Sequence, residues 1–347
     1  MTVEVSETQS SKSDNGTVWG ELLFTYSNDE LDHNPDTYLK LQTPHRERPK
    51  RTAWKQLHSL RPEIESLRPC SDSKKLLDAR TGLARRGFAA IPHHSQVLAE
   101  QGIDSQHDYS LLIEENQKLM KQITGADEII VWNTVKRDST ASTSASLADN
   151  FEHQRGPQGV VSRFDKPIEP PALFAHIDQD PSYGAKVCSM AIAGTPSLLP
   201  ESSTIDPSEA IEKDLAKGYS RTMIINLWRP VGGTVYDKPL AVADYRSLSQ
   251  ASLPLHANPF GCGYDIHAHA KQEWHFIPHQ TNDGVLVFKC YDSLSLRQQD
   301  QPPLNGEAEA LYGAHCAVTR LKGDYPAPPP DAPPRKSAEF RFVAVWR

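Results

Sequence analysis

Residues 220–228, SRTMIINLW, concentrate β-branched and other apolar side chains in one short run, which is typical of a buried β-strand. Similar runs lie on both sides of it, each bounded by Gly, Pro, Asn, Asp or Ser. They are KVCSMAIA (186–193), PLAVAD (239–244), EWHFIP (273–278), GVLVFKCYD (284–292), AHCAVTRL (314–321) and AEFRFVAVW (338–346). So many short, closely spaced strands predict a mainly β barrel or sandwich with helical decoration, not a parallel α/β sheet.

Helices and further strands are predicted around this core. Residues 74–94 should turn at Gly82 and again at Gly87, before a short buried strand at 88–91. The other predicted elements are a strand from Val18 to Tyr26, a helix over residues 108–123 with Gly125 as its C-cap, a strand over 128–135, and a helix over 207–219 with Ser208 as its N-cap and Gly218 at its end.

The chain is predicted to form one folded unit behind a short tail. Residues 1–17 are polar and should be disordered, because they hold too few apolar side chains to fix one conformation. Residues 18–347 should form a single domain with an N-terminal α/β extension. The loops at 138–165 and 250–272 are expected to shape substrate specificity.

The composition favours a small-molecule partner. The formal net charge is -7, and a surplus of negative charge opposes binding to nucleic acid or anionic lipid. No apolar run reaches the roughly 20 residues that a membrane helix needs, and the N-terminal residues lack the pattern of a signal peptide. We therefore expect a cytoplasmic protein with no nucleic-acid and no membrane partner.

His176 and Asp178, in LFAHIDQDPSYGA (173–185), are candidate metal ligands. Residues at i and i+2 of an extended segment leave the same face, so both side chains could bind one ion. With a second histidine they would make the facial triad that leaves positions open on Fe(II) for a cosubstrate and oxygen. A hydrogen-bonded surface His and Asp would explain the pair equally well, since one such pair is expected by chance.

A third ligand should come from a distant strand that a barrel brings back beside the first. GAHCAVTR (313–320) offers His315 among small and apolar neighbours. A zinc site built from His267, His269, His275 and His279 is an alternative, although no second pair at zinc-protease spacing accompanies them.

Arg335 and Ser337, in APPRKSAEFRF (332–342), lie two residues apart at the start of a predicted strand and so share a face. A guanidinium can grip a carboxylate with two charge-assisted hydrogen bonds, and a hydroxyl can add one more. The pair could therefore clamp the distal carboxylate of a dicarboxylic acid. An Arg paired with a neighbouring Asp or Glu at a strand edge is the structural alternative.

Several ordered motifs resemble a family of fungal and bacterial proteins, the AsaB-like hydroxylase/desaturase family. It includes gibberellin desaturase-like proteins, a cephamycin methoxylation subunit and a meroterpenoid endoperoxide-forming enzyme. The resemblance spans about residues 75–347. It is carried by LDARTGLARRGFAAIPHHS (77–95), TGADEIIVWNTVKR (124–137), AHIDQDPSYGA (175–185), IINLWRPVGGTVYDKPLAVADYRSL (224–248), FKCYDS (288–293), AHCAV (314–318) and DAPPRKSAEFR (331–341).

The resemblance implies a double-stranded β-helix core, that is, a jelly-roll or cupin-like oxygenase domain. It also implies a dioxygenase that uses Fe(II), 2-oxoglutarate and O2 to hydroxylate, desaturate or otherwise oxidise a small natural product in secondary-metabolite biosynthesis. A homodimer or a heterodimer with a related oxygenase would be compatible with it. One relative acts in a two-protein system, so a non-catalytic partner subunit is the alternative function.

The resemblance also implies roles for single residues. The iron ligands, which are the catalytic residues, fall on His176, Asp178 and His315. Arg335 and Ser337 match the R-x-S pair that binds 2-oxoglutarate.

The motif NLWRP (226–230) is expected to be a core strand whose inward residues reach the cosubstrate or substrate. Asn226 and Arg229 are the candidate cofactor-binding residues there, with Trp228 beside them. A purely structural role for the motif is the alternative.

Overall fold

The computed structural model describes residues 17–26, 50–65, 73–100, 102–141, 168–194, 206–249, 253–258, 261–298 and 309–347. Nearly all of the expected tail and most of the 138–165 loop lie outside these ranges. In the described ranges, no helix is long and apolar enough to cross a membrane.

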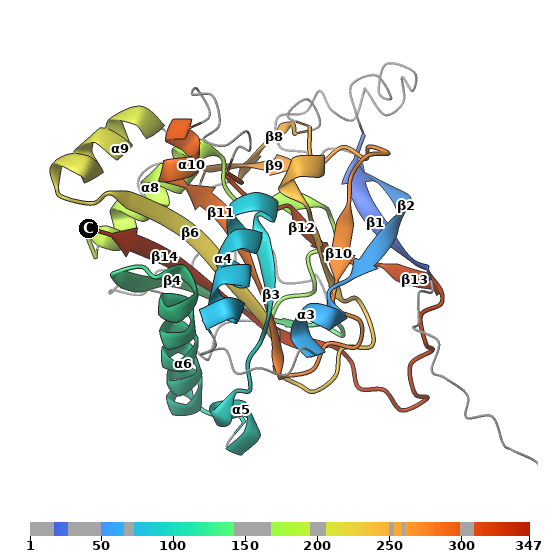
Figure 1. Ribbon diagram of the computed structural model, residues 1–347. Coiled ribbons are helices and arrows are strands. Elements are labelled where there is room, and N and C mark those ends of the chain that lie inside the picture. The colour runs from blue at the N-terminus through green and yellow to red at the C-terminus, as the bar shows by residue number, and fades with distance from the viewer. Residues whose placement is uncertain are drawn as a thin grey trace, which may run out of the picture.

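The described residues form two β-sheets (Figure 1). In spatial order, the nine-stranded sheet contains β13 (Arg320–Gly323), β1 (Val18–Thr25), β2 (Lys50–Ser59), β10 (Trp274–Phe276), β7 (Leu240–Ala243), β12 (His315–Ala317), β5 (His176–Ile177), β9 (Gly261–Asp265) and β8 (Leu255–Asn258). The five-stranded sheet contains β3 (Phe88–Pro92), β11 (Gly284–Asp292), β6 (Arg221–Pro230), β14 (Lys336–Trp346) and β4 (Glu128–Asp138). Neighbouring strands are antiparallel except β2 and β10.

Helices cover the outer face of the five-stranded sheet (Figure 1). The α-helices are α3 (Arg61–Glu65), α4 (Ser73–Arg86), α5 (Gln96–Glu100), α6 (Gln106–Thr124), α8 (Pro181–Ile192), α9 (Pro207–Ala216) and α10 (Ser293–Gln298), and η1 (Tyr245–Ser247) is a 3-10 turn. Of these, α4 and α6 pack directly on that face, with Leu83 and Leu112 in one core with Leu227 of β6.

The alternation of side chains along β6 separates two cores. Ile225 and Leu227 face α4 and α6, whereas Ile224 and Trp228 belong to a second core that includes Val242 of the other sheet. Since successive residues of a strand point to opposite faces, one strand serves both. Each fully buried aliphatic or aromatic side chain contributes roughly 1.5–3 kcal/mol, so these cores hold the two sheets face to face.

Most predicted elements agree with this structure. The expected strands at 220–228, 239–244, 273–278, 284–292 and 338–346 correspond to β6, β7, β10, β11 and β14. The helix expected at 108–123 is α6, and Gly125 caps it in the left-handed conformation, with a φ of 70°. The prediction of a mainly β fold with helical decoration is confirmed.

The strand predicted at 186–193 is wrong, because these residues belong to α8. Asp180 is the N-cap, its side chain accepts a hydrogen bond from the backbone N–H of Tyr183, and Pro181 follows in the first turn. Pro at that position and an Asp cap favour a helix start. A short apolar run cannot be assigned to strand or helix by periodicity alone.

The predicted turn at Gly82 and the predicted N-cap at Ser208 are also wrong. Gly82 does not form a turn but lies inside α4, where a Cβ would stand 2.9 Å from the carbonyl oxygen of Phe88. Its missing side chain lets α4 approach β3. The N-cap of α9 is Asp206, whose carboxylate accepts from the backbone N–H of Ser208.

Two longer segments also differ from expectation. The strand predicted at 314–321 is divided into β12 and β13, which lie at different positions in the nine-stranded sheet. The segment 250–272, expected as a loop, contributes the paired strands β8 and β9. As a result, β12 and β9 both pair with β5, where the candidate site lies.

A substitution at Gly184 tests how α8 is packed. In an exposed helix, changing Gly to Ala stabilises by about 1 kcal/mol. Here a Cβ would lie 2.5 Å from Cγ of Tyr291, so Gly184→Ala should instead lower the free energy of unfolding by about 1–3 kcal/mol through overpacking. Urea denaturation measures this change. The same substitution in a Tyr291→Leu background should cost less, and a raised midpoint in the single variant would contradict the packing.

Candidate active site

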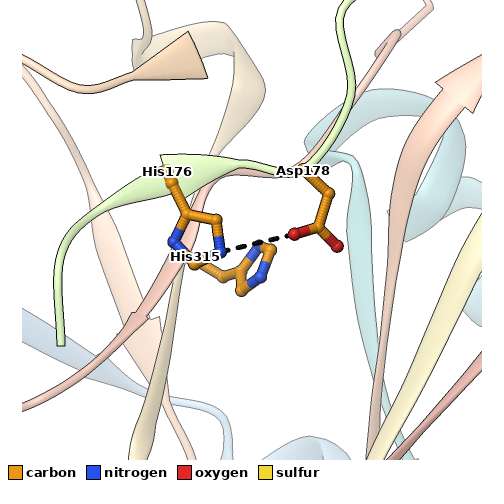
Figure 2. Close-up of side chains that lie close together, drawn as sticks. All are labelled: His176, Asp178 and His315. Atoms are coloured by element: carbon orange, nitrogen blue, oxygen red, sulfur yellow. Dashed lines mark ion pairs between the residues drawn. The ribbon is translucent and has the colours of Figure 1, made fainter. Parts of the chain in front are cut away.

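His176, Asp178 and His315 converge on one point (Figure 2). His176 begins β5 and His315 begins β12, and these two residues pair directly across the antiparallel strands. Directly opposed residues project to the same face, and the two imidazole centroids lie 4.3 Å apart. One potential ligand atom from each of the three residues lies within 4.8 Å of the others.

Backbone carbonyls orient both imidazoles. Nδ1 of His176 lies 2.8 Å from the carbonyl oxygen of Phe174, and Nδ1 of His315 lies 3.3 Å from that of Gly313. A carbonyl oxygen can only accept, so each ring donates from Nδ1, and Nε2 is the nitrogen left to bind a metal. Burial, with His176 beside it, lowers the pKa of His315 to about 4, which keeps this ring neutral near pH 7.

Donors from the five-stranded sheet surround Asp178. Its Oδ2 accepts a hydrogen bond from Nδ2 of Asn226 at 2.9 Å, and lies 3.6 Å from Sγ of Cys290 and 3.7 Å from Nη2 of Arg341. Burial by itself would raise the pKa of Asp178, but the Arg341 charge and the contact with His176 outweigh it and hold the pKa well below its usual range. Asp178 is therefore ionised.

Glu339 adds a second carboxylate to this cluster. Its Oε1 accepts from Nε of Arg341 at 2.7 Å and from Nδ2 of Asn226 at 3.4 Å. Asp178 and Glu339 thus share one guanidinium, so the three groups together carry an excess negative charge in the interior. Such a charge is costly unless a cation offsets it.

The donor set fits a metal centre with open positions. Two neutral imidazoles and one carboxylate are the ligands of the facial triad that non-haem Fe(II) oxygenases use. A structural zinc site would instead be closed by four protein ligands. The three residues therefore match the chemistry of Fe(II) better than that of structural zinc.

Arg335 is a buried cation with no carboxylate in ion-pair contact among the described residues. It is 2% exposed, and burial, with Arg137 nearby, lowers its pKa to about 9. Its Nε and Nη2 lie 3.2 Å from Oγ of Ser337, and its guanidinium packs 4.9 Å above the ring of Trp228. Asp237 accepts a hydrogen bond from the backbone N–H of Arg335 at 2.8 Å, but the described residues form no ion pair with its guanidinium, so a ligand carboxylate could bind there.

Arg229 does not join this site, which corrects the expectation that it binds a cofactor. It is completely buried on the opposite face of β6, where its guanidinium donates to Oδ1 of Asn116 at 3.0 Å and to the carbonyl oxygen of Asn282 at 2.7 Å. Asn226 and Arg229 are three residues apart, and an odd spacing along a strand places two side chains on opposite faces.

The four histidines of the alternative zinc site do not gather in the described part of the chain. Of these four, only His275 belongs to a second group that could hold a metal, with Asp244 and Glu273. The Asp244 carboxylate is engaged there by Nη2 of Arg246 at 2.6 Å.

Arg341, Glu339 and Cys290 were missed by sequence reasoning. The first two had a visible signal, because RKSAEFR (335–341) places Arg, Ser, Glu and Arg at alternate positions, hence on one face of β14. Cys290 had none, since a single cysteine in an apolar strand is usually part of a core.

Two fungal relatives resemble this chain in sequence. The hydroxylase/desaturase efuI of Hormonema carpetanum is 24% identical over 281 residues, which cover 76% of this chain and 78% of that protein. Aspirochlorine biosynthesis protein N of Aspergillus oryzae is 35% identical over 141 residues, which cover 38% of this chain and half of that relative's length. The resemblance to hydroxylase/desaturase proteins is thereby confirmed.

A solved structure resembles this one in fold. The iron and alpha-ketoglutarate-dependent endoperoxidase NvfI superposes with a TM-score of 0.60 at 19% identity, over 95% of this chain and 98% of that one. A likeness at this level of identity establishes the fold, and it confirms the expected jelly roll.

A family model extends over almost the entire sequence. It is described as an Oxidoreductase/YMDC permease-like domain, and it matches residues 24–345. The chain therefore belongs to this oxidoreductase family.

Proposed function

We propose that this protein is an Fe(II)/2-oxoglutarate-dependent dioxygenase. It oxidises a C–H bond of a small natural product in secondary-metabolite biosynthesis, by hydroxylation, desaturation or a related reaction. One observation carries the proposal: the cluster around Asp178 has an excess negative charge, while Arg335 is a buried cation without a carboxylate in ion-pair contact among the described residues. A divalent metal with a dicarboxylate beside it would offset both charges.

The names of the relatives support this reaction class. One is a hydroxylase/desaturase, another the Fe(II)/2-oxoglutarate-dependent dioxygenase nvfI of Aspergillus novofumigatus, and a third the alpha-ketoglutarate-dependent dioxygenase phiK. They offer no support for a non-catalytic partner subunit. Location in the cytoplasm, and assembly as a homodimer or as a heterodimer with a related oxygenase, stay predictions of the sequence.

His176, Asp178 and His315 would hold the iron. When bound, iron with 2-oxoglutarate and O2 supplies the oxidising power for removing hydrogen from an unactivated carbon. The backbone carbonyls of Phe174 and Gly313 orient the two imidazoles through their Nδ1 atoms. Aromatic rings pack on them, Phe288 at 4.3 Å from His315 and Phe174 at 4.7 Å from His176 between centroids, which limits ring movement and the entry of water.

Arg335 and Ser337 would bind the distal carboxylate of 2-oxoglutarate. The Trp228 ring packs on one side of the guanidinium, and its Nε1–H is buried with no hydrogen-bond acceptor among the described residues. Glu339 interacts electrostatically with both Arg335 and His315, which supports a carboxylate site and a metal site within one buried region.

Removal of a ligand tests the metal centre. His176→Ala and Asp178→Ala should each abolish Fe(II)-dependent formation of succinate from 2-oxoglutarate, because a facial triad has no ligand to spare. Mass spectrometry of succinate measures this. His279→Ala, which removes a member of the alternative zinc cluster, should leave succinate formation intact. Undiminished turnover in either triad variant would exclude the proposed centre.

Removal of the clamp tests the cosubstrate site. A hydrogen bond to a charged group contributes roughly 1.5–3 kcal/mol, so Arg335→Ala should raise the apparent KM for 2-oxoglutarate about 10- to 100-fold, with a smaller change in kcat. Arg229→Ala removes an equally buried arginine from the other face and should lower Tm without changing this KM. An unaltered KM in Arg335→Ala would place the carboxylate site elsewhere.

A further inference from the structure

The two oxygens of the Asp178 carboxylate have different surroundings. Oδ1 lies 3.4 Å from Nε2 of His176, on the side where the ligand atoms converge (Figure 2). Oδ2 faces the five-stranded sheet, where Asn226, Cys290 and Arg341 all approach it. Among the described residues, the five-stranded sheet thus directs its donors to one carboxylate oxygen, Oδ2.

The donors come from two strands whose register sets their positions. Asn226 of β6 and Arg341 of β14 are directly paired, so their side chains leave the sheet side by side. Glu339, two residues before Arg341, shares their face and accepts a hydrogen bond from each. Asn226 is completely buried, and Glu339 nearly so. The acceptor Glu339 therefore fixes the direction of both donors.

We propose that Asn226, Arg341 and Glu339 form a cradle that positions Asp178 to bind the metal through Oδ1, with Oδ2 retained for hydrogen bonds to the protein. The inference rests on the proposed function and adds positioning residues to it. It also gives Asn226 a different role from the cofactor contact expected from the sequence, because its amide N–H groups are directed at Asp178 and Glu339.

The cradle acts through the ligand, not on the substrate. Residues that hydrogen-bond to a metal ligand fix its orientation, and their loss typically weakens metal binding about 10- to 100-fold. Without Asn226 and Arg341, Asp178 is free to rotate and to present either oxygen or neither. The guanidinium also offsets part of the charge that Asp178 and Glu339 place in the interior.

Co(II) binding to the full chain tests the cradle without any need for the substrate. Asn226→Leu keeps the branched shape of the side chain, with a larger volume, and removes its donors. It should raise the Kd for Co(II) at least tenfold and change the visible absorption spectrum of the bound ion. Asn116→Leu is the matched control, because Asn116 is an equally buried asparagine that bonds to Arg229 on the other face. It should lower Tm and leave the Kd unchanged.

A second pair of variants covers a failure of Asn226→Leu to fold. Arg341→Lys keeps the charge but loses the forked geometry, so the Kd for Co(II) should rise several-fold, whereas Arg229→Lys should leave it unchanged. Wild-type Kd and spectrum in Asn226→Leu, or in Arg341→Lys where the first variant does not fold, would overturn the cradle while the metal centre stands. Absence of Co(II) binding to the unmodified protein would overturn the metal centre and the cradle with it.

Discussion

The direct pairing of His176 with His315 across β5 and β12 is the constraint on which the rest of the site depends. Because side chains alternate along a strand, a shift of one residue in either strand would turn one imidazole to the opposite face. Both strands are short, and their neighbours hold the register: β12 also pairs with β7, and β5 with β9. The long sheet thus serves to align two residues that are distant in the chain.

The five-stranded sheet supplies the charged and polar groups that surround Asp178. Along β14, alternate residues from Ser337 to Arg341 carry polar groups inward, while the residues between them, such as Phe340, pack against the helices. Charges so deeply buried cannot rely on water, so each must meet a partner or a ligand. Negative charge gathers at Asp178, and positive charge lies at Arg335, which forms no ion pair among the described residues. Because the two charges are separated within the buried region, a cation could bind near Asp178 and an anion near Arg335.

The sequence was informative where local geometry alone sets the outcome. The i, i+2 spacing of His176 and Asp178, the R-x-S pair and the Gly125 cap all follow from the period of one strand or helix, and the structure places them accordingly. Predictions from the sequence were wrong where tertiary packing determines the local structure. The run at 186–193 has the composition of a strand but is helical, since Asp180 and Pro181 start a helix that packs on β11. Arg229 was grouped with Asn226 by proximity in the chain, although the pleat separates them.

By itself, then, the sequence determined the mainly β class and identified the candidate metal ligands and the proposed carboxylate clamp, because these depend on residue types and on short spacings. Only the tertiary structure decided which residues meet Asp178. Arg341 and Asn226 lie far from it in the chain, and their contact arises from the register of β6 with β14 and from the packing of one sheet on the other. Such contacts form only when distant strands pack together, so the spacing of residues along one strand or helix does not predict them.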